Sequence, residues 1–385
     1  MNVVFISTYP PRECGIANFT YDLINSLEDF DDINCYVISL SKDKYDYDER
    51  VLFDIYHDNF SDYIKAIKII NSQNIDIAVI EHEYGIFGGE DGRYIIPMAK
   101  MIKKPIITTF HTVLRNPSQN QFDILKALAD ISYKVITMAN STKEILIDLY
   151  GINKEKIEVI HHGVPYMNLP SKEILKEKYG LKGKKVISTF GLLSPGKGLE
   201  YAILAMDKVR NSFPNTVYLI LGQTHPNVKK EKGEEYREKL IKLVKDLNLE
   251  DNVKFVDKYL TKKEILEYLK LTDIYLTPYR GREQAVSGTL AYALGCGKAI
   301  ISTPYTYAKE MLSNGRGILV NFEDSNSIAL AIIKLLGDEK LRRELEEKAL
   351  EIGKEMYWYN VAKKMIEIFN KINHVYRKEG VVTWS

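Results

Sequence analysis

The residues best suited to chemistry lie in a glycine-rich loop between an apolar run and an amphipathic stretch. Residues 185–190 are followed by Gly191-Leu-Leu-Ser-Pro-Gly-Lys-Gly198. Backbone N–H groups converge where a strand turns into a helix, and glycine lets an anion approach closely, so this loop can hold a phosphate. Lys197 adds a full positive charge. Gly198 stands where a Walker A motif has Ser or Thr, which disfavours a nucleotide-hydrolysing loop. An ordinary turn with an exposed lysine is the alternative.

A second candidate anion site follows residues 274–277, which form another expected strand. It combines charged residues with small residues at an expected helix start, where free amide groups suit an anion. Its members are Arg280, Arg282, Glu283, Gln284, Ser287, Gly288 and Thr289. Taken alone, the pattern favours a helix-capping sequence beside surface charges.

Polar residues also follow two expected strands in the first half of the chain. His111 comes directly after residues 106–110, and a polar group at the carboxyl end of a parallel strand faces the crevice where ligands bind. A hydrogen-bonded structural histidine is the alternative. Glu83 and Tyr84 lie in a glycine-rich stretch, residues 82–92, which suggests a shaped ligand-binding loop. A long turn is the alternative there.

The elements that position these residues are short strands that alternate with longer amphipathic helices. Such alternation is typical of strand–helix units around a parallel sheet, so the predicted fold class is α/β. The expected strands are residues 3–7, 35–40, 77–81, 106–110, 134–138 and 157–160, then 185–190, 217–221, 253–256, 274–277, 299–302 and 317–320. The expected helices include residues 17–27, 63–71, 142–150, 199–211, 234–247, 262–271, 289–294, 325–336 and 358–376.

Composition limits the class of protein. The chain has 385 residues, of which 45% are hydrophobic and 27% charged, which indicates a globular protein of two domains. Its 53 Lys and Arg residues balance 52 Asp and Glu residues, which disfavours nucleic-acid binding. Three widely spaced cysteines disfavour a disulfide framework or a zinc site. No apolar run reaches the roughly 20 residues that span a bilayer, so we expect a cytoplasmic protein, with peripheral membrane contact left open.

Regular alternation pauses at residues 166–184, where prolines and glycines stand among polar residues. Pro165, Pro170, Gly180 and Gly183 punctuate this stretch. The pattern predicts the domain boundary there.

Several motifs follow one another in an informative order. They are a glycine-containing loop at Gly15, Phe110-His111-Thr112, His162-Gly163-Val164, the Lys197-Gly198 loop and a helix ending at Gly295-Cys-Gly297. This order resembles that of the retaining GT-B glycosyltransferases of the group 1 type, which use nucleotide-sugar donors. The match spans nearly the whole chain, and its order and spacing are fairly specific.

The resemblance implies two Rossmann-like domains that face each other across a cleft. Residues 1–167 would form the acceptor-side domain and residues 168–356 the domain that binds the nucleotide sugar. The last helix, within residues 357–385, would cross back onto the N-terminal domain. The stripe it would bury comprises Val361, Met365, Ile368, Phe369 and Ile372.

The resemblance also implies roles for individual residues. Lys197 would bind the donor pyrophosphate and stabilise negative charge on the departing diphosphate. His111 would orient the donor sugar, while Glu283 or Gln284 would hold sugar hydroxyls. The further donor-binding candidates are Gly15, Gly196, Arg282, Ser287, Gly288 and Thr289. The acceptor-binding candidates are Arg12, Glu83 and Tyr84.

The sequence departs from the family pattern in its cations. Leu192 stands where the family commonly has an arginine, directly after the glycine that opens the lysine loop. Arg280 or Arg282 is therefore expected to supply the second positive charge.

It also departs in its carboxylates. The family has two glutamates, separated by seven residues, before the glycine that matches Gly297. An ungapped alignment places Gln284 and Tyr292 there, and a one-residue shift places Glu283 and Ala291. Neither register supplies both carboxylates, so recognition of the ribose must be rebuilt or weakened.

We therefore expect an enzyme, a retaining hexosyltransferase that uses a nucleotide-diphosphate sugar and a hydroxyl acceptor on a sugar, polyol or lipid-linked molecule. No motif requires a metal or a further cofactor. The alternatives are a sugar-nucleotide epimerase, a glycoside phosphorylase, or a sugar- or nucleotide-binding protein without activity.

Overall fold

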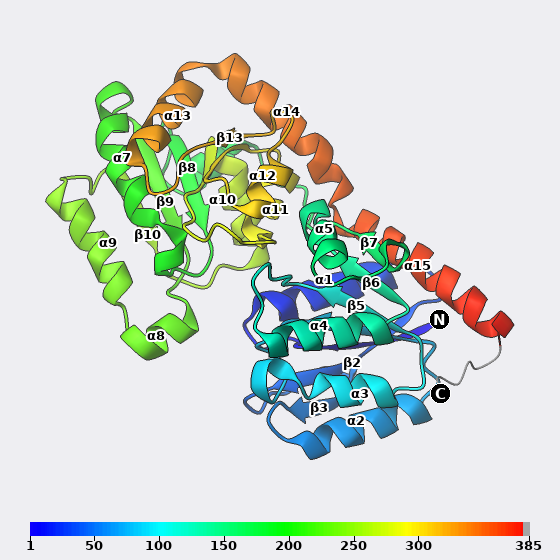
Figure 1. Ribbon diagram of the computed structural model, residues 1–385. Helices are drawn as coiled ribbons and strands as arrows, with labels where there is room; N and C mark the ends of the chain where they lie inside the picture. The colour runs from blue at the N-terminus through cyan, green and yellow to red at the C-terminus, as the bar shows by residue number, and fades with distance from the viewer. Residues whose placement is uncertain (380–385) are drawn as a thin grey trace. The chain divides into compact units, whose positions relative to one another are not determined.

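The computed structural model describes residues 1–379, which form two compact units (Figure 1). The N-terminal unit comprises Met1–Gly163 and the final segment from Tyr357, and the C-terminal unit comprises Val164–Met356. Each unit contains one parallel sheet flanked by helices, so the predicted α/β class is confirmed. Residues 380–385, the end of the segment predicted to return to the N-terminal domain, lie outside the described residues.

The sheet of the N-terminal unit has seven strands in the order β3-β2-β1-β4-β5-β6-β7. They are β1 (Asn2–Ser7), β2 (Asn34–Ser41), β3 (Val51–Tyr56), β4 (Ile77–His82), β5 (Ile106–Phe110), β6 (Lys134–Thr137) and β7 (Ile157–Val159). Its α-helices are α1 (Gly15–Glu28), α2 (Phe60–Ser72), α3 (Ile95–Met101), α4 (Gln119–Ile131), α5 (Asn140–Asp148) and α15 (Trp358–Glu379). The strand order reverses between β1 and β4, so the connections from these strands run in opposite directions.

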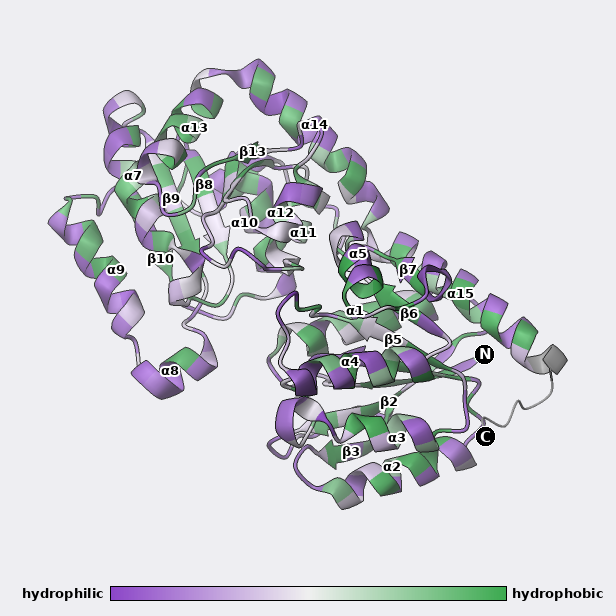
Figure 2. Cartoon of the chain, in the orientation of Figure 1, coloured by the Kyte–Doolittle hydropathy of each residue, from purple (hydrophilic) through white to green (hydrophobic). Residues whose placement is uncertain are grey.

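Apolar residues of the strands form the core of this unit (Figure 2). Ile80 of β4 belongs to a buried cluster with Ile67 of α2, Met98 of α3 and Leu128 of α4. Helix α15 packs on α1 and buries the predicted stripe of Val361, Met365, Ile368, Phe369 and Ile372. The apolar face predicted for the last helix is therefore confirmed, and this helix is part of the N-terminal unit.

The sheet of the C-terminal unit has six strands in the order β10-β9-β8-β11-β12-β13. They are β8 (Lys185–Phe190), β9 (Thr216–Leu221), β10 (Val253–Val256), β11 (Ile274–Thr277), β12 (Ala299–Ser302) and β13 (Ile318–Leu319). The α-helices are α6 (Lys172–Lys178), α7 (Leu199–Ser212), α8 (Pro226–Lys232), α9 (Glu235–Asp246), α10 (Lys262–Leu271), α11 (Gly288–Gly295), α12 (Thr306–Met311), α13 (Ser325–Gly337) and α14 (Glu339–Glu355). Here the order reverses between β8 and β11.

Among the described residues, no helix has the length and apolar character needed to cross a membrane.

The expected elements did not include β3, α3, α4, α6, α8, α12 or α14. Strand β3 lies at an edge of its sheet, and most of its side chains are partly exposed, so it lacks the apolar run of a central strand. Helix α6 lies in the stretch interpreted as a pause. Its N-cap residue Ser171 accepts a hydrogen bond from the amide of Ile174 at 3.4 Å, and Gly180 follows the helix with φ +68°. These residues begin and end a helix rather than interrupt the fold.

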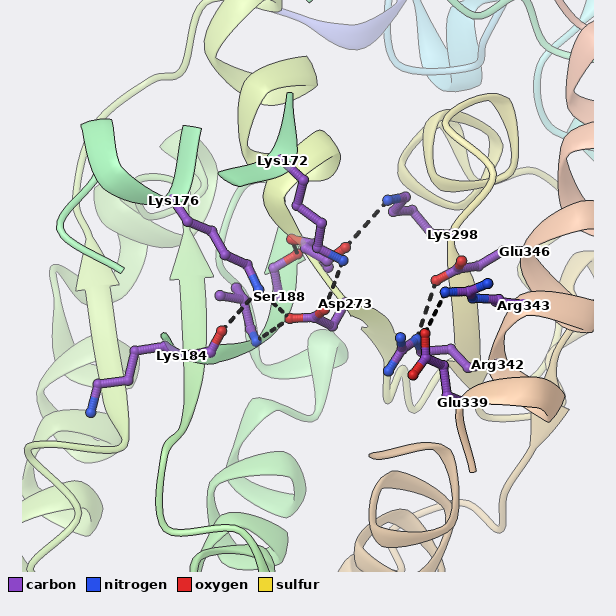
Figure 3. A network of polar contacts seen from close by, with 12 residues as sticks. Lys172, Lys176, Lys184, Ser188, Asp273, Lys298, Glu339, Arg342, Arg343 and Glu346 are labelled. Carbon is purple, nitrogen blue, oxygen red and sulfur yellow. Dashed lines mark hydrogen bonds and ion pairs between the residues drawn. The ribbon is translucent and has the colours of Figure 1, made fainter. Parts of the chain in front are cut away.

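A buried aspartate fastens α6 to the central strands of the C-terminal unit (Figure 3). The Oδ1 atom of Asp273 lies 2.7 Å from Nζ of Lys172, and its Oδ2 atom lies 2.7 Å from Nζ of Lys176. The amide of Val186 in β8 also donates to Oδ2 at 2.7 Å. Burial alone would raise the pKa of Asp273, but the two ammonium groups and the amide outweigh it and lower the pKa to about 2. The carboxylate therefore remains charged and joins α6 to β8 and β11.

We expect Asp273→Asn to lower the free energy of unfolding by about 2 to 4 kcal/mol, because two ammonium groups lose a buried anion. Since the folded pKa lies below the unfolded value, this stabilisation should be complete well above pH 3.8 and be lost as the pH falls toward about 2. Urea unfolding followed by circular dichroism measures both effects.

Glu177→Gln is the matched control for this variant. Glu177 pairs with Lys182 at 2.9 Å, and both side chains are exposed. Exposed pairs contribute less than about 1 kcal/mol, so this variant should remain close to wild type. Equal losses in the two variants would contradict the structural role of Asp273.

Candidate active site

The predicted site residues lie on loops that leave the central strands of the two sheets. In the C-terminal unit these loops follow β8 and β11, between which the strand order reverses. In the N-terminal unit they follow β1, β4 and β5. Parallel α/β sheets bind ligands at the carboxyl ends of strands where the order reverses. The residues selected from the sequence therefore fall at the sheet edge that favours binding.

Two glycines shape the loop that follows β8. Gly191 adopts φ +126° and Gly198 adopts φ +60°, which L side chains rarely adopt. A Cβ atom on Gly198 would lie 2.3 Å from the carbonyl oxygen of Pro278, so only glycine allows this close approach to the segment after β11. The amide of Arg280 donates to the carbonyl oxygen of Gly196 at 2.9 Å. The two loops are therefore joined into one surface.

Lys197 presents its ammonium group to the ring of Tyr279. Its Nζ atom lies 3.9 Å from the ring centroid, which is a cation–π contact. Nζ also lies 3.9 Å from the position that a Cβ atom on Gly191 would take, and Cγ2 of Thr289 lies 3.3 Å from that position. The Tyr279 hydroxyl and Oγ1 of Thr289 form a hydrogen bond of 2.7 Å. The ammonium group is therefore near the end of β8, the segment after β11 and the first turn of α11.

Helix α11 begins with small hydroxyl residues. Ser287 is its N-cap residue, and its Oγ accepts a hydrogen bond from the amide of Leu290 at 3.3 Å. Oγ1 of Thr289 lies 3.2 Å from the same Oγ. The first amide groups of a helix have no partner within it and carry partial positive charge. With Lys197, the predicted residues Ser287, Gly288 and Thr289 therefore form a region suited to an anion.

Two arginines lie beside the lysine loop. Nε of Arg280 lies 2.5 Å from Oε1 of Glu323, and the guanidinium group of Arg282 lies 4.3 Å from the ring centroid of Phe322. A hollow of about 450 Å³ is lined by Pro195, Gly196, Arg280, Gly281, Arg282, Phe322 and Glu323. Two arginines therefore lie beside Pro195 and Gly196 of the lysine loop in the fold, although neither belongs to that loop in the sequence.

The loop that carries Glu283 and Gln284 is fixed to the start of α12. The amide of Thr306 donates to the carbonyl oxygen of Arg282 at 3.0 Å, and the amide of Tyr307 donates to that of Gln284 at 3.1 Å. The side-chain amide of Gln284 donates to the carbonyl oxygen of Val286 at 3.1 Å. Glu283 is exposed. Hydrogen bonds thus fix the backbone of this loop, and the side chain of Glu283 lies at the protein surface.

In the N-terminal unit, His111 pairs with a carboxylate that sequence reasoning missed. Nε2 of His111 lies 2.8 Å from Oε2 of Glu81, the penultimate residue of β4. The Glu81 side chain is fully buried and that of His111 is 10% exposed. The His111 ring also meets the ring of Phe19 edge-on, with centroids 4.8 Å apart. His111 is therefore held on two sides.

Two further histidines near His111 are held neutral. Burial, followed by the influence of His111, lowers the pKa of His82 to about 3 and that of His162 to about 4. The ring of His162 packs near Phe19 and Trp358, with centroids 5.3 Å and 6.2 Å away. His162, which belongs to the His162-Gly163-Val164 motif, is thus a buried packing residue of the N-terminal unit.

The candidate acceptor residues have different environments. Glu83 accepts a hydrogen bond from the Thr112 hydroxyl at 2.5 Å, which brings it next to His111. Tyr84 is only 8% exposed, and its hydroxyl donates to the carbonyl oxygen of Gln121 at 3.2 Å, so the structure favours packing over acceptor contact. Arg12 donates to the carbonyl oxygen of Leu40 at 3.0 Å. Gly15 is exposed at the first residue of α1, which follows β1.

Two family models match separate parts of the chain. The model described as "Glycosyl transferases group 1" matches residues 171–351, and the model described as "Glycosyltransferase Family 4" matches residues 14–166. The chain belongs to the group 1 glycosyltransferases. The family predicted by the order of the motifs is therefore confirmed.

Curated relatives agree with this glycosyltransferase assignment. An uncharacterized glycosyltransferase of Methanocaldococcus jannaschii is 24% identical over 96% of this chain and 98% of that protein. The N-acetylgalactosamine-N,N'-diacetylbacillosaminyl-diphospho-undecaprenol 4-alpha-N-acetylgalactosaminyltransferase of Campylobacter jejuni is 24% identical over 66% of this chain and 67% of that protein.

Solved structures share the fold of this glycosyltransferase. A glycosyltransferase of Rickettsia africae superposes with a TM-score of 0.78 at 18% identity, over 96% of this chain and 98% of that one. Anabaena HepE in complex with UDP superposes with a TM-score of 0.78 at 17% identity, over 96% of this chain and 100% of that one. The predicted GT-B fold, with its two Rossmann-like domains, is confirmed.

Sequence reasoning missed two residues that contact the predicted site residues of this glycosyltransferase. Tyr279 follows β11 and contacts Lys197, while Glu81 is the penultimate residue of β4 and contacts His111. Tyr279 and Glu81 both lie near the carboxyl ends of strands, which is the feature by which His111 was selected from the sequence. An aromatic residue or a carboxylate within a strand pattern carries no sign of its contact partner, so the sequence alone did not separate them from core residues.

We expect Gly198→Ala to lower the free energy of unfolding by about 2 kcal/mol or more, because it forces a side chain into a left-handed backbone and a contact of 2.3 Å. Gly196→Ala is the matched control in the same loop. The atom nearest to its new Cβ would be Oγ of Ser194 at 3.9 Å, so its stability should stay within about 0.5 kcal/mol. Denaturant unfolding compares the two, and similar stabilities would show that the close approach to Pro278 is not needed.

Proposed function

We propose that this glycosyltransferase moves a hexose, with retention of configuration, from a nucleotide-diphosphate sugar to a hydroxyl group of an acceptor. The observation that carries the proposal is the position of the Lys197 ammonium group beside the end of β8, Tyr279 and the first turn of α11. A cation and a helix start converge there at the carboxyl edge of a parallel sheet. A diphosphate fits this combination of charge and amide groups.

The proposed role of Lys197 is to stabilise the leaving group. When the bond between the sugar and the diphosphate breaks, negative charge grows on the phosphate oxygens. A fixed ammonium group and the amide groups of Gly288 and Thr289 stabilise this charge more in the transition state than in the ground state, which accelerates the reaction. Arg280 and Arg282 line the adjoining hollow, where Arg280 is paired with Glu323 and Arg282 supplies further positive charge.

The proposed sugar contacts come from His111 in the N-terminal unit and from Glu283 or Gln284 in the C-terminal unit. His111 orients the donor sugar, and Glu283 or Gln284 holds its hydroxyl groups. In a front-face reaction the departing phosphate takes the proton of the acceptor hydroxyl, so the proposal requires neither a protein base nor a metal ion. The retaining outcome rests on family analogy.

Relatives support the proposed classes of substrate. Solved structures of Anabaena HepE contain UDP and UDP-glucose, and the name of the Campylobacter jejuni relative includes a diphospho-undecaprenol acceptor. These facts favour a nucleotide-sugar donor for this chain. The proposed acceptor is a sugar, a polyol or a lipid-linked molecule. The epimerase, phosphorylase and binding-protein alternatives gain no support from the family models.

We expect Lys197→Ala to reduce kcat by about 10²-fold or more while leaving the melting temperature near that of wild type, because it removes a transition-state contact from a half-exposed side chain. Lys182→Ala is the control, since it removes an exposed lysine of the same unit. The donor is first identified by thermal-shift screening of UDP, GDP, ADP and their sugars. Product formation is then measured with and without acceptor.

The outcomes of this experiment are distinct. Loss of transfer in Lys197→Ala but not in Lys182→Ala supports the proposal. Wild-type turnover in Lys197→Ala contradicts the role of the lysine. Conversion of the nucleotide sugar without an acceptor, or dependence on inorganic phosphate, contradicts glycosyl transfer itself.

A further inference from the structure

The contact between Glu81 and His111, the proposed sugar contact, joins the ends of two neighbouring strands, β4 and β5. Strands β4 and β5 pair in register, with Glu81 opposite Thr109 and His82 opposite Phe110. The amide of His111 donates to the carbonyl oxygen of His82 at 3.1 Å, which extends this pairing by one residue. The His111 backbone is therefore fixed by the sheet, and its side chain meets the carboxylate two residues away on the opposing strand.

The carboxylate of Glu81 has a limited set of contacts. Its Oε2 atom lies 2.8 Å from Nε2 of His111, and its Oε1 atom accepts a hydrogen bond from the Thr109 hydroxyl at 3.4 Å. Its side chain is completely buried. An ionised carboxylate only accepts hydrogen bonds, so the ring nitrogen that faces it must carry a proton. A lone pair on Nε2 would instead point at a buried anion, which is strongly unfavourable.

We propose that Glu81 is a positioning residue that holds His111 as the Nε2–H tautomer, so that Nδ1 offers a lone pair to a hydroxyl group of the sugar. This inference rests on the proposed function, because it specifies how His111 recognises its substrate. The group recognised at Nδ1 is a hydroxyl that donates a hydrogen bond. Fixing the tautomer before the substrate binds also removes the cost of reorienting the ring during the reaction.

Other groups around His111 cannot replace Glu81. Phe19 meets the imidazole edge-on and contributes no hydrogen bond. His82 and His162 are held neutral by burial, and an imidazole supplies no negative charge in either of its protonation states. Glu83 lies on the same strand end, but its carboxylate accepts from the Thr112 hydroxyl and the amide of Tyr84. Glu83 is therefore a matched control for the removal of a nearby charge.

The first test reads the tautomer directly and needs no activity. In the full chain with ¹⁵N-labelled histidine, long-range ¹H–¹⁵N spectra distinguish the protonated ring nitrogen, and His111→Gln assigns the signals of His111. We expect neutral His111 to carry its proton on Nε2 in the wild type and in Glu83→Gln. In Glu81→Gln the amide can turn its N–H toward Nε2, so the Nδ1–H form should increase. A neutral Nδ1–H ring in the wild type would overturn the proposal, even if no variant folds.

The second test separates positioning from packing. We expect Glu81→Gln to lower kcat at least about tenfold, with KM for the donor sugar changed less than about threefold, because a misplaced tautomer affects the reacting state most. In the His111→Ala background, Glu81→Gln should cause no further loss. An equal loss in both backgrounds, or wild-type kcat in Glu81→Gln, would overturn the positioning role.

This design also keeps the two proposals apart. If the wild type transfers no sugar from any donor, the proposed function fails, and the tautomer spectra still decide whether Glu81 sets the state of His111. If transfer proceeds but His111→Ala retains the wild-type rate, glycosyl transfer stands and the role of Glu81 in it is overturned.

Discussion

The hydrogen-bonded pairing of parallel strands is the constraint on which the site depends. It places every carboxyl end at the same edge of a sheet, so loops far apart in the sequence meet there. In the C-terminal unit, the loop after β8 approaches the segment after β11 so closely that Gly198 has no space for a side chain beside Pro278. The hydrogen bond from the amide of Arg280 to the carbonyl oxygen of Gly196 joins the same two segments. These contacts between the two loops determine the position of Lys197.

Some charged side chains of this protein form ion pairs, whereas two cations near the candidate site pack on aromatic rings instead. Buried Asp273 pairs with the partly exposed Lys172 and Lys176, which holds α6 in place. Lys197 and Arg282 instead rest on the rings of Tyr279 and Phe322. The face of an aromatic ring attracts a cation without neutralising it. These two cations therefore retain a full charge for an anionic ligand.

The N-terminal unit combines packing with preorganisation. Phe19 contacts both His111 and Trp358, so the first residue of α15 and the candidate sugar contact share one aromatic neighbour. Glu81 fixes the other side of His111 from within the sheet. Rings held in this way lose little freedom when a ligand binds, which favours recognition of a single geometry.

The sequence predicted most of the central strands because buried parallel strands are short apolar runs. Strands β5, β8, β10, β11 and β12 have the expected bounds to the residue. The edge strand β3 was missed because partial exposure removes that signal, and α6 was missed because its capping residues resemble a linker. Tyr84 was assigned to the acceptor loop from its glycine-rich surroundings, whereas packing buries it. Sequence proximity to a loop does not determine which side chains reach its surface.

By itself, the sequence determined the α/β class, the family and the loops that carry the candidate residues, because periodicity, glycine placement and motif order are properties of the chain alone. Only the tertiary structure decided which side chains support them. Tyr279 under Lys197 and Glu81 against His111 are separated by tens of residues from their partners. Such contacts depend on strand order and register, which bring residues together through pairing between strands rather than through neighbouring positions in the sequence.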